Sequence, residues 1–235
     1  MSNLLTLQNS ISFASTILKN QPLLVSNFEP ALTAGNLVLG VMLGPPCKWS
    51  FNRASYSFVI SQAGGTDYSV YLPSFGALET QWLTDATGNI FELQGKTSLA
   101  KDNNSSRPTA LAVQYDDNAG NITFRLKQAP DQAYTVFIDY QKKMVPMTSP
   151  AQTWGGVSDH FAYIYNWGFL CLASLLVNDS RFPIFEQYFI SRLLGAQDGL
   201  SEQERNIMVG AWMALVQTTA RAQGAVNSGI AGRGK

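Results

Sequence analysis

His160 is the single histidine of the chain and follows Asp159, a pairing that could form part of a catalytic proton relay. Neighbouring residues on a helix point about 100° apart, however, so their side chains do not face each other. Ser158 and Asp159 also stand where a helix N-cap is expected, because polar and acidic side chains there satisfy free backbone amides. The pattern therefore favours a helix cap over a catalytic pair.

Two carboxylate pairs could supply acid–base chemistry or hold a cation. Asp116 and Asp117 stand in an Asp-Asp-Asn-Ala-Gly sequence that is typical of a hairpin turn, and no glutamate follows to close a calcium loop. Glu202 and Glu204 follow Ser201, and the Ser-x-x-Glu spacing predicts a capping box at the start of a helix. Both pairs are therefore interpreted as structural.

The remaining nucleophiles and motifs give no further indication of chemistry. Cys47 and Cys171 match no metal or redox spacing, and Cys171 lies in an apolar run that predicts a buried thiol. The sequence contains no HExxH, GxSxG, Walker or GxGxxG pattern. We therefore expect a protein that is not an enzyme, with no catalytic residues, no metal ligands and no cofactor.

The composition indicates a folded protein with a partly covered surface. Of the 235 residues 46% are hydrophobic, but only 14% are charged, against about 25% in typical globular domains. This favours an obligate oligomer, although a surface rich in Ser, Thr, Asn and Gln would be an alternative. Sixteen basic and sixteen acidic residues cancel, so no net field would draw the protein onto nucleic acid or an anionic membrane.

No segment is expected to act as a secretory signal or to cross a membrane. The first residues lack a basic region. The most apolar stretch, 161–177, is interrupted by Asn166 and is too short to span a bilayer.

Hydrophobic spacing predicts helices at both ends of the chain. Leu4–Lys19 carries apolar residues three and four apart, and Pro30–Leu43 is an apolar run with proline at its first helical position. Towards the other end, helices are predicted over Ser158–Val177 and Phe182–Ala196, and a third begins at Ser201.

The middle of the chain alternates instead with a period of two, most clearly over Tyr134–Lys142. About seven strands are predicted. Their ranges are 56–61, 67–72, 81–84, 90–94, 110–115, 121–127 and 134–142, with a hairpin turn at 116–120 and an Asn- and Ser-rich loop at 102–106.

The fold class that follows is α+β, with N- and C-terminal helices forming an α-helical bundle around an inserted antiparallel β-sandwich or barrel. The predicted parts are 1–48 and 151–221 for the bundle and 49–150 for the β domain. Residues 222–235 hold four glycines and no acidic residue, and are expected to form a flexible basic arm.

Several phrases of the sequence resemble a family of phage structural proteins, the head-to-tail adaptors (also called connector or tail tubular proteins) of short-tailed bacteriophages. The phrases are GPPCKWSFNR (44–53), DYSVYLPSFGALE (67–79), NITFRLKQAPDQAYTVFIDYQKK (121–143) and RFPIFEQYFISRL (181–193). They are spread over most of the chain and contain no catalytic signature.

The resemblance implies a virion protein assembled in the host cytoplasm, forming a ring of twelve copies that joins the portal protein to the tail nozzle protein. Double-stranded DNA would pass through the ring without specific binding. The balanced charge of the chain agrees with this role. The alternative is a β-sandwich module that binds carbohydrate or recognises the host; exposed Trp and Tyr on one sheet face would favour it.

Five residues are predicted at partner interfaces. Arg221, Arg233 and Lys235 would belong to an arm that inserts between portal subunits. Trp49 and Arg53 would anchor the β domain to the bundle, since aromatic residues bury a large area. An ordinary core position for Trp49 is the alternative.

Overall fold

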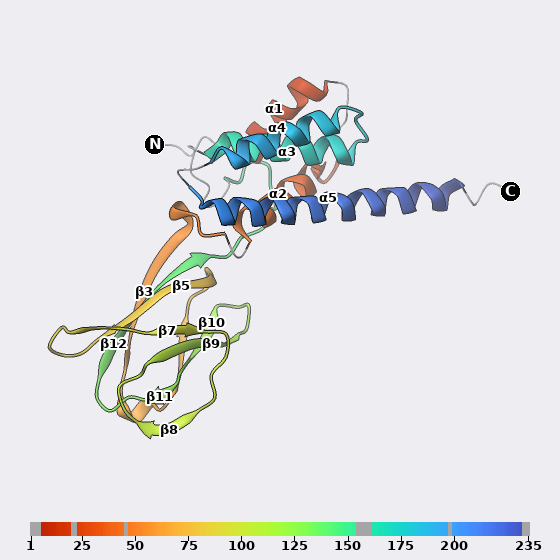
Figure 1. Ribbon diagram of the computed structural model, residues 1–235. Helices are drawn as coiled ribbons and strands as arrows, with labels where there is room; N and C mark the ends of the chain where they lie inside the picture. Colours follow the sequence, from red (N-terminus) through yellow and green to blue (C-terminus); the bar gives the residue numbers. More distant parts are fainter. Residues whose placement is uncertain (1–5, 20–22, 45–46, 154–160, 197–198, 232–235) are drawn as a thin grey trace. The chain divides into compact units, whose positions relative to one another are not determined.

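The structure is a computed structural model that describes residues 6–19, 23–44, 47–153, 161–196 and 199–231 (Figure 1). The chain divides into two compact units. The helical unit comprises Met1–Phe51 and Met144–Lys235, and the β unit comprises Asn52–Lys143. The fold is mixed α+β, and the two segments of the helical unit flank the β unit in the sequence.

The helical unit holds the long helices of the described chain. They are α1 (Leu7–Leu18), α2 (Ala31–Leu43), α3 (Ala162–Leu176), α4 (Phe182–Leu194) and α5 (Glu202–Ala231), together with the short strands β1 (Leu24–Ser26) and β2 (Glu29–Pro30) and a 3-10 turn that begins at Ser50.

Helix α1 begins at a polar cap and buries one face, and the buried face is the one that the sequence predicts. The Thr6 hydroxyl accepts a hydrogen bond from the backbone amide of Asn9 at 3.1 Å, which satisfies one of the free amides of the first turn. The buried positions recur every three or four residues and are Leu7, Ser10, Ile11, Ala14 and Leu18. Helix α2 differs from the prediction by one position, because Pro30 is its N-cap and not its first residue.

Helix α3 lies at the centre of the helical unit and contacts α1, α2 and α4. Gly168 makes this close packing possible, since a Cβ there would lie 2.9 Å from Phe189 and 3.0 Å from Val38. The hydroxyl of Tyr165, buried in the same core, donates a hydrogen bond to the Gly35 carbonyl oxygen at 3.0 Å. Cys171 is buried here, as predicted.

Helix α5 begins with the predicted capping box: the Ser201 hydroxyl donates to Glu204 at 2.6 Å and accepts from the Glu204 amide at 3.3 Å. The helix then continues to Ala231. Residues 222–231, predicted to belong to a flexible arm without helical periodicity, are therefore helical in the structure, and residues 232–235 lie outside the described part. No proline interrupts this segment, and each glycine costs only about 1 kcal/mol in a helix.

The β unit contains the seven predicted strands and three short strands that were not predicted, at 94–96, 102–105 and 128–129; the strand at 102–105 lies where the sequence predicts a loop. They are β3 (Arg53–Ile60), β4 (Asp67–Tyr71), β5 (Phe75–Thr84), β6 (Ile90–Glu92), β7 (Gln94–Lys96), β8 (Asp102–Ser105), β9 (Ala110–Asp116), β10 (Asn121–Leu126), β11 (Gln128–Ala129) and β12 (Tyr134–Lys142), with a 3-10 turn at Gln62–Gly64.

The strands form two four-stranded sheets, in the orders β3-β12-β5-β6 and β4-β10-β9-β7, and a short pair β11-β8. The first sheet is antiparallel throughout, but β7 pairs with β9 in parallel, and so does β8 with β11. The expectation of a wholly antiparallel domain is therefore wrong. Residues 97–109 form the long crossover connection that a parallel pair requires.

Both four-stranded sheets contribute to one hydrophobic core of the β unit. Val136 and Ile138 from β12, Leu83 from β5 and Phe124 from β10 are all fully buried in it. The predicted turn at 116–120 joins β9 to β10, where the Asp117 carboxylate accepts hydrogen bonds from the amides of Ala119 and Asn121. This confirms the structural interpretation of the Asp116–Asp117 pair.

No helix in the described ranges is long and apolar enough to cross a lipid bilayer.

Candidate functional site

The outward face of the sheet β3-β12-β5 carries an aromatic pair and a set of hydrogen-bonded polar side chains. Along β12 the residues alternate, so that Val136 and Ile138 enter the core while Phe137 and Asp139 lie on the opposite face. The register places Ser57 of β3 and Trp82 of β5 on either side of Phe137.

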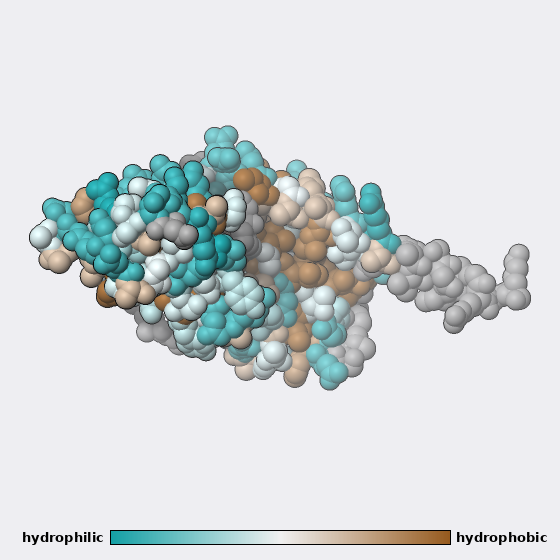
Figure 2. Space-filling view, turned by 90° about the horizontal axis from the view of Figure 1, so that it is seen from below, coloured by the Kyte–Doolittle hydropathy of each residue, from teal (hydrophilic) through white to brown (hydrophobic). Residues whose placement is uncertain are grey.

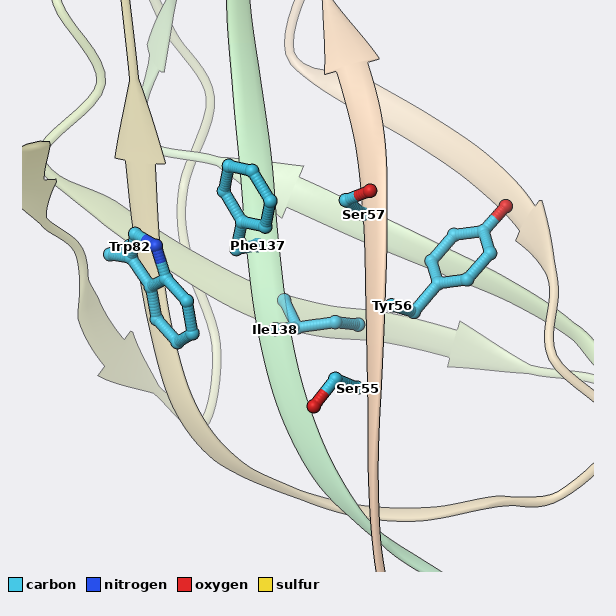
Figure 3. Close-up of a pocket in the computed structure, with 6 residues that line it drawn as sticks. All are labelled: Ser55, Tyr56, Ser57, Trp82, Phe137 and Ile138. Carbon is cyan, nitrogen blue, oxygen red and sulfur yellow. The ribbon is translucent and has the colours of Figure 1, made fainter. Parts of the chain in front are cut away.

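Trp82 and Phe137 form a parallel aromatic pair on this face (Figure 3). Their ring centroids lie 5.6 Å apart and the ring planes differ by 7°, a geometry typical of offset stacking. Both side chains are only partly buried. Ser57 is small, so the side of Phe137 that faces β3 is left open, and a shallow depression of about 460 Å³ lies over these residues.

Beside the aromatic pair, the Asp139 carboxylate is held in place by two hydroxyl groups. Ser55 of β3 donates a hydrogen bond to Oδ1 at 2.6 Å, and Thr80 of β5 donates to Oδ2 at 2.8 Å. These bonds fix the carboxylate across three strands, and each of its oxygens retains a lone pair that can accept another hydrogen bond. The face thus combines flat apolar rings with oriented oxygen acceptors.

Arg53, one of the predicted interface residues, lies at one end of the same face and is part of an ion pair. Its guanidinium contacts both carboxylate oxygens of Glu79, with a 2.9 Å hydrogen bond from Nε to Oε2. Hydrogen bonding to Glu79 and the charge of that carboxylate raise the pKa of Arg53. Gln141 donates to Glu79 at 2.8 Å, so Arg53 joins β3 to β5 and β12.

Trp49 lies in the helical unit, with its ring fully buried. It packs against Phe51 and Phe161 at centroid distances of 5.1 and 5.0 Å, and its indole nitrogen bonds to the Met42 carbonyl oxygen. A ring buried in this way is not accessible to another protein. The geometry therefore supports the core position that the sequence left as an alternative, and Trp49 and Arg53 belong to different units.

The basic residues predicted for the arm are only partly covered by the structure. Arg221 is exposed on α5, whereas Arg233 and Lys235 lie outside the described residues, as do Ser158, Asp159 and His160. Cys47 and Cys171 are buried. Burial, with the nearby Glu204 carboxylate, raises the pKa of the Cys47 thiol to about 11, and burial also raises that of Cys171.

The helical unit carries exposed hydrophobic surface beside α5 (Figure 2). An apolar groove of about 520 Å³ runs between α2, α5 and the segment that follows residue 143. We call it the α2 groove; Thr33, Asn36, Leu37, Gly40, Val41, Met144, Pro146 and Leu215 line it. None of the lining side chains is ionisable.

Comparison with known proteins adds no relative: no family model matches the chain, and no curated protein matches it.

Trp82 and Phe137 were not predicted from the sequence, although one signal pointed to Phe137. Phe137 occupies an outward position of β12 together with Thr135 and Asp139, so an aromatic residue stands where the alternation calls for polar ones. The pairing of Trp82 with Phe137 could not be predicted from the sequence. It depends on the register between β5 and β12, which shifts at a bulge between Asp139 and Tyr140.

Proposed function

We propose that the chain is a structural, ring-forming virion protein that joins the portal vertex of a phage head to the tail nozzle and lines the DNA channel. In this proposal the helical unit is the α-helical bundle that assembles a ring of twelve copies. The β unit is an inserted β-sandwich that contacts the next tail component. The protein has no chemistry of its own, and the portal and nozzle proteins are its partners.

The observation that carries the proposal is the uncharged exposed surface of helix α5 in the helical unit. From Asn206 to Ala220 helix α5 contains no ionisable side chain, although nine of these residues are exposed. A helix on the surface of a monomer normally presents charged residues to water. An exposed face of this kind is typical of a contact with another protein, and repeated contacts between copies form closed rings.

The resemblance to head-to-tail adaptors suggests that this contact joins neighbouring copies in a ring. The balanced charge of the chain supports a second part of the proposal, that DNA passes through the ring. A strongly basic channel wall would hold phosphate groups and slow the movement of DNA. With equal numbers of acidic and basic residues, the ring would let DNA pass.

The test is mass photometry of the purified chain, alone and mixed with the portal ring of the same phage. The proposal predicts a complex with one copy of the chain per portal subunit. A chain that stays monomeric alone but forms this complex also agrees with it, since the portal ring would then act as the template. No association with the portal ring at any salt concentration would overturn it.

The aromatic pair Trp82–Phe137 favours a second candidate, a carbohydrate-binding module. Sugar rings stack their apolar face on aromatic side chains, and their hydroxyl groups donate to carboxylates such as Asp139. A glycan array would test it: a specific sugar signal that is lost in Trp82→Ala and kept in Tyr115→Ala, an exposed tyrosine of the other sheet, would support it. An empty array would exclude it.

A further inference from the structure

Two glycines in the helical unit are not explained by packing against the described residues. Among these residues, a Cβ on Gly210 of α5 would meet no atom within 4 Å, and one on Gly40 of α2 would meet only the Met144 sulfur at 3.8 Å. Glycine inside a helix is about 1 kcal/mol less stable than alanine. Gly168, in contrast, is required by the atoms around it. Gly40 and Gly210 therefore weaken their helices without any gain in internal packing.

Both glycines stand on exposed, uncharged surfaces. Gly40 is exposed in the α2 groove. Gly210 belongs to a row of exposed residues along one side of the helix, which we call the α5 stripe: Ile207, Gly210, Ala211, Ala214 and Thr218. This stripe lies on the side of the helix opposite Met208, Trp212 and Val216, which are buried in the core.

The two surfaces suit each other in size and polarity. Gly210, Ala211 and Ala214 of the α5 stripe are small and let another backbone approach closely, because the distance between packed helices is set by the side chains at their contact. The missing side chain at Gly40 leaves room for such an approach in the α2 groove. Neither surface carries a charged side chain, so their contact would not cost the free energy of burying an ion without a partner.

We propose that the α5 stripe of one copy packs into the α2 groove of the next copy, with Gly210 and Gly40 at the closest approach. The inference rests on the proposed ring. The occupant is a second copy because the stripe is itself an uncharged helix that needs such a groove. Stripe and groove are different surfaces, so the contact is head-to-tail, and repetition of a head-to-tail contact produces a ring when the rotation closes.

Disulfide trapping between two variants that each carry one added cysteine tests this contact. Gly40→Cys and Gly210→Cys are purified separately, mixed and oxidised, both at high concentration and in the presence of the portal ring. Cys47 and Cys171 should form few disulfides in this experiment, because buried thiols with raised pKa values hold little reactive thiolate. The control partner for Gly40→Cys is Gln187→Cys, at an exposed position of α4.

A Gly40–Gly210 contact predicts that the mixed pair forms a cross-linked dimer at least about tenfold faster than the control pair, because only that pair holds its thiols together. A chain that carries both cysteines should give a ladder of cross-linked species. A rate equal to the control under both conditions would overturn the inference, as would faster self-linking of Gly210→Cys alone. If the cross-linking test fails but wild-type protein still binds the portal ring, the Gly40–Gly210 contact is excluded and the proposed function is not.

Discussion

The indole nitrogen of Trp49 donates a hydrogen bond to the carbonyl oxygen of Met42 at 2.6 Å, and both residues are fully buried. Met42 lies in the last turn of α2, where backbone carbonyls have no partner within the helix. The Trp49 side chain therefore satisfies a carbonyl group in the last turn of α2 and also fills the core of the helical unit between Phe51 and Phe161.

Replacing Trp49 by alanine should remove this contact and leave a cavity. The expected loss in the free energy of unfolding is about 3–5 kcal/mol, measured by urea unfolding followed by far-UV circular dichroism. Trp82→Ala is the matched control, because Trp82 is only partly buried on a sheet face and should cost clearly less. Equal losses for the two variants would contradict a core role for Trp49.

The same substitution should have opposite effects at two helix glycines. Gly210→Ala adds a methyl group in open space and should raise the free energy of unfolding by about 0.5–1 kcal/mol. Gly168→Ala places a Cβ 2.9 Å from Phe189 and 3.0 Å from Val38 and should lower it by about 1–3 kcal/mol. Thermal unfolding of both variants, compared with wild type, would show the difference; a stabilised Gly168→Ala would contradict the packing described for α3.

Local patterns predicted much of this fold, because caps and periodicity act over a few residues. The Ser201–Glu204 box, the row of apolar residues in α1 and the alternation in β12 are all present in the structure. The parallel pairing of β7 with β9 could not be predicted in this way. It depends on where the connection 97–109 leads, which strand length and alternation do not encode.

The candidate sites were less predictable, for two physical reasons. Trp49 was assigned to an interface because a tryptophan buries a large area, but residue type does not say whether that area meets the same unit or a partner. Trp82 and Phe137 lie 55 positions apart in the sequence, and only the register of β5 on β12 brings their rings together. Likewise, the open surroundings of Gly40 and Gly210 are visible only in three dimensions.

Asp67 should make the stability of the β unit depend on pH. Hydrogen bonds from Arg125, opposed by burial and assisted by Lys101, lower the pKa of this carboxyl to about 2. Because the pKa is lower in the folded state, the stabilisation is complete above the unfolded pKa of about 4. It is lost as the pH falls from about 4 to about 2.

The expected effect of Asp67→Asn is a loss of about 1 kcal/mol at neutral pH, a small value because the pair with Arg125 is partly exposed and screened by solvent. The difference in the free energy of unfolding between Asp67→Asn and wild type should disappear near pH 2. Chemical unfolding of both proteins at several pH values would measure this difference. A difference that persists unchanged at the lowest pH would show that the ionised carboxylate is not its cause.

Shortening helix α5 would test how its C-terminal part serves docking. The α5 residues in the core of the helical unit are Met208, Trp212 and Val216 among the described positions, so a chain that ends at Arg221 should fold with a nearly unchanged free energy of unfolding. Under the proposed function it should no longer join filled heads, because it lacks the segment expected to insert between portal subunits. Binding to the portal ring, measured by mass photometry, is the readout.

A second truncation, after Ala231, separates the helix from the last basic residues. It keeps the whole of α5 as described but removes Arg233 and Lys235. If the positive charges dock the chain, this variant should bind as poorly as the shorter one, and the binding of wild type should weaken as salt is raised. If the helix itself is the docking element, the chain that ends at Ala231 should bind normally. Normal binding by the chain that ends at Arg221 would exclude both forms of the arm hypothesis.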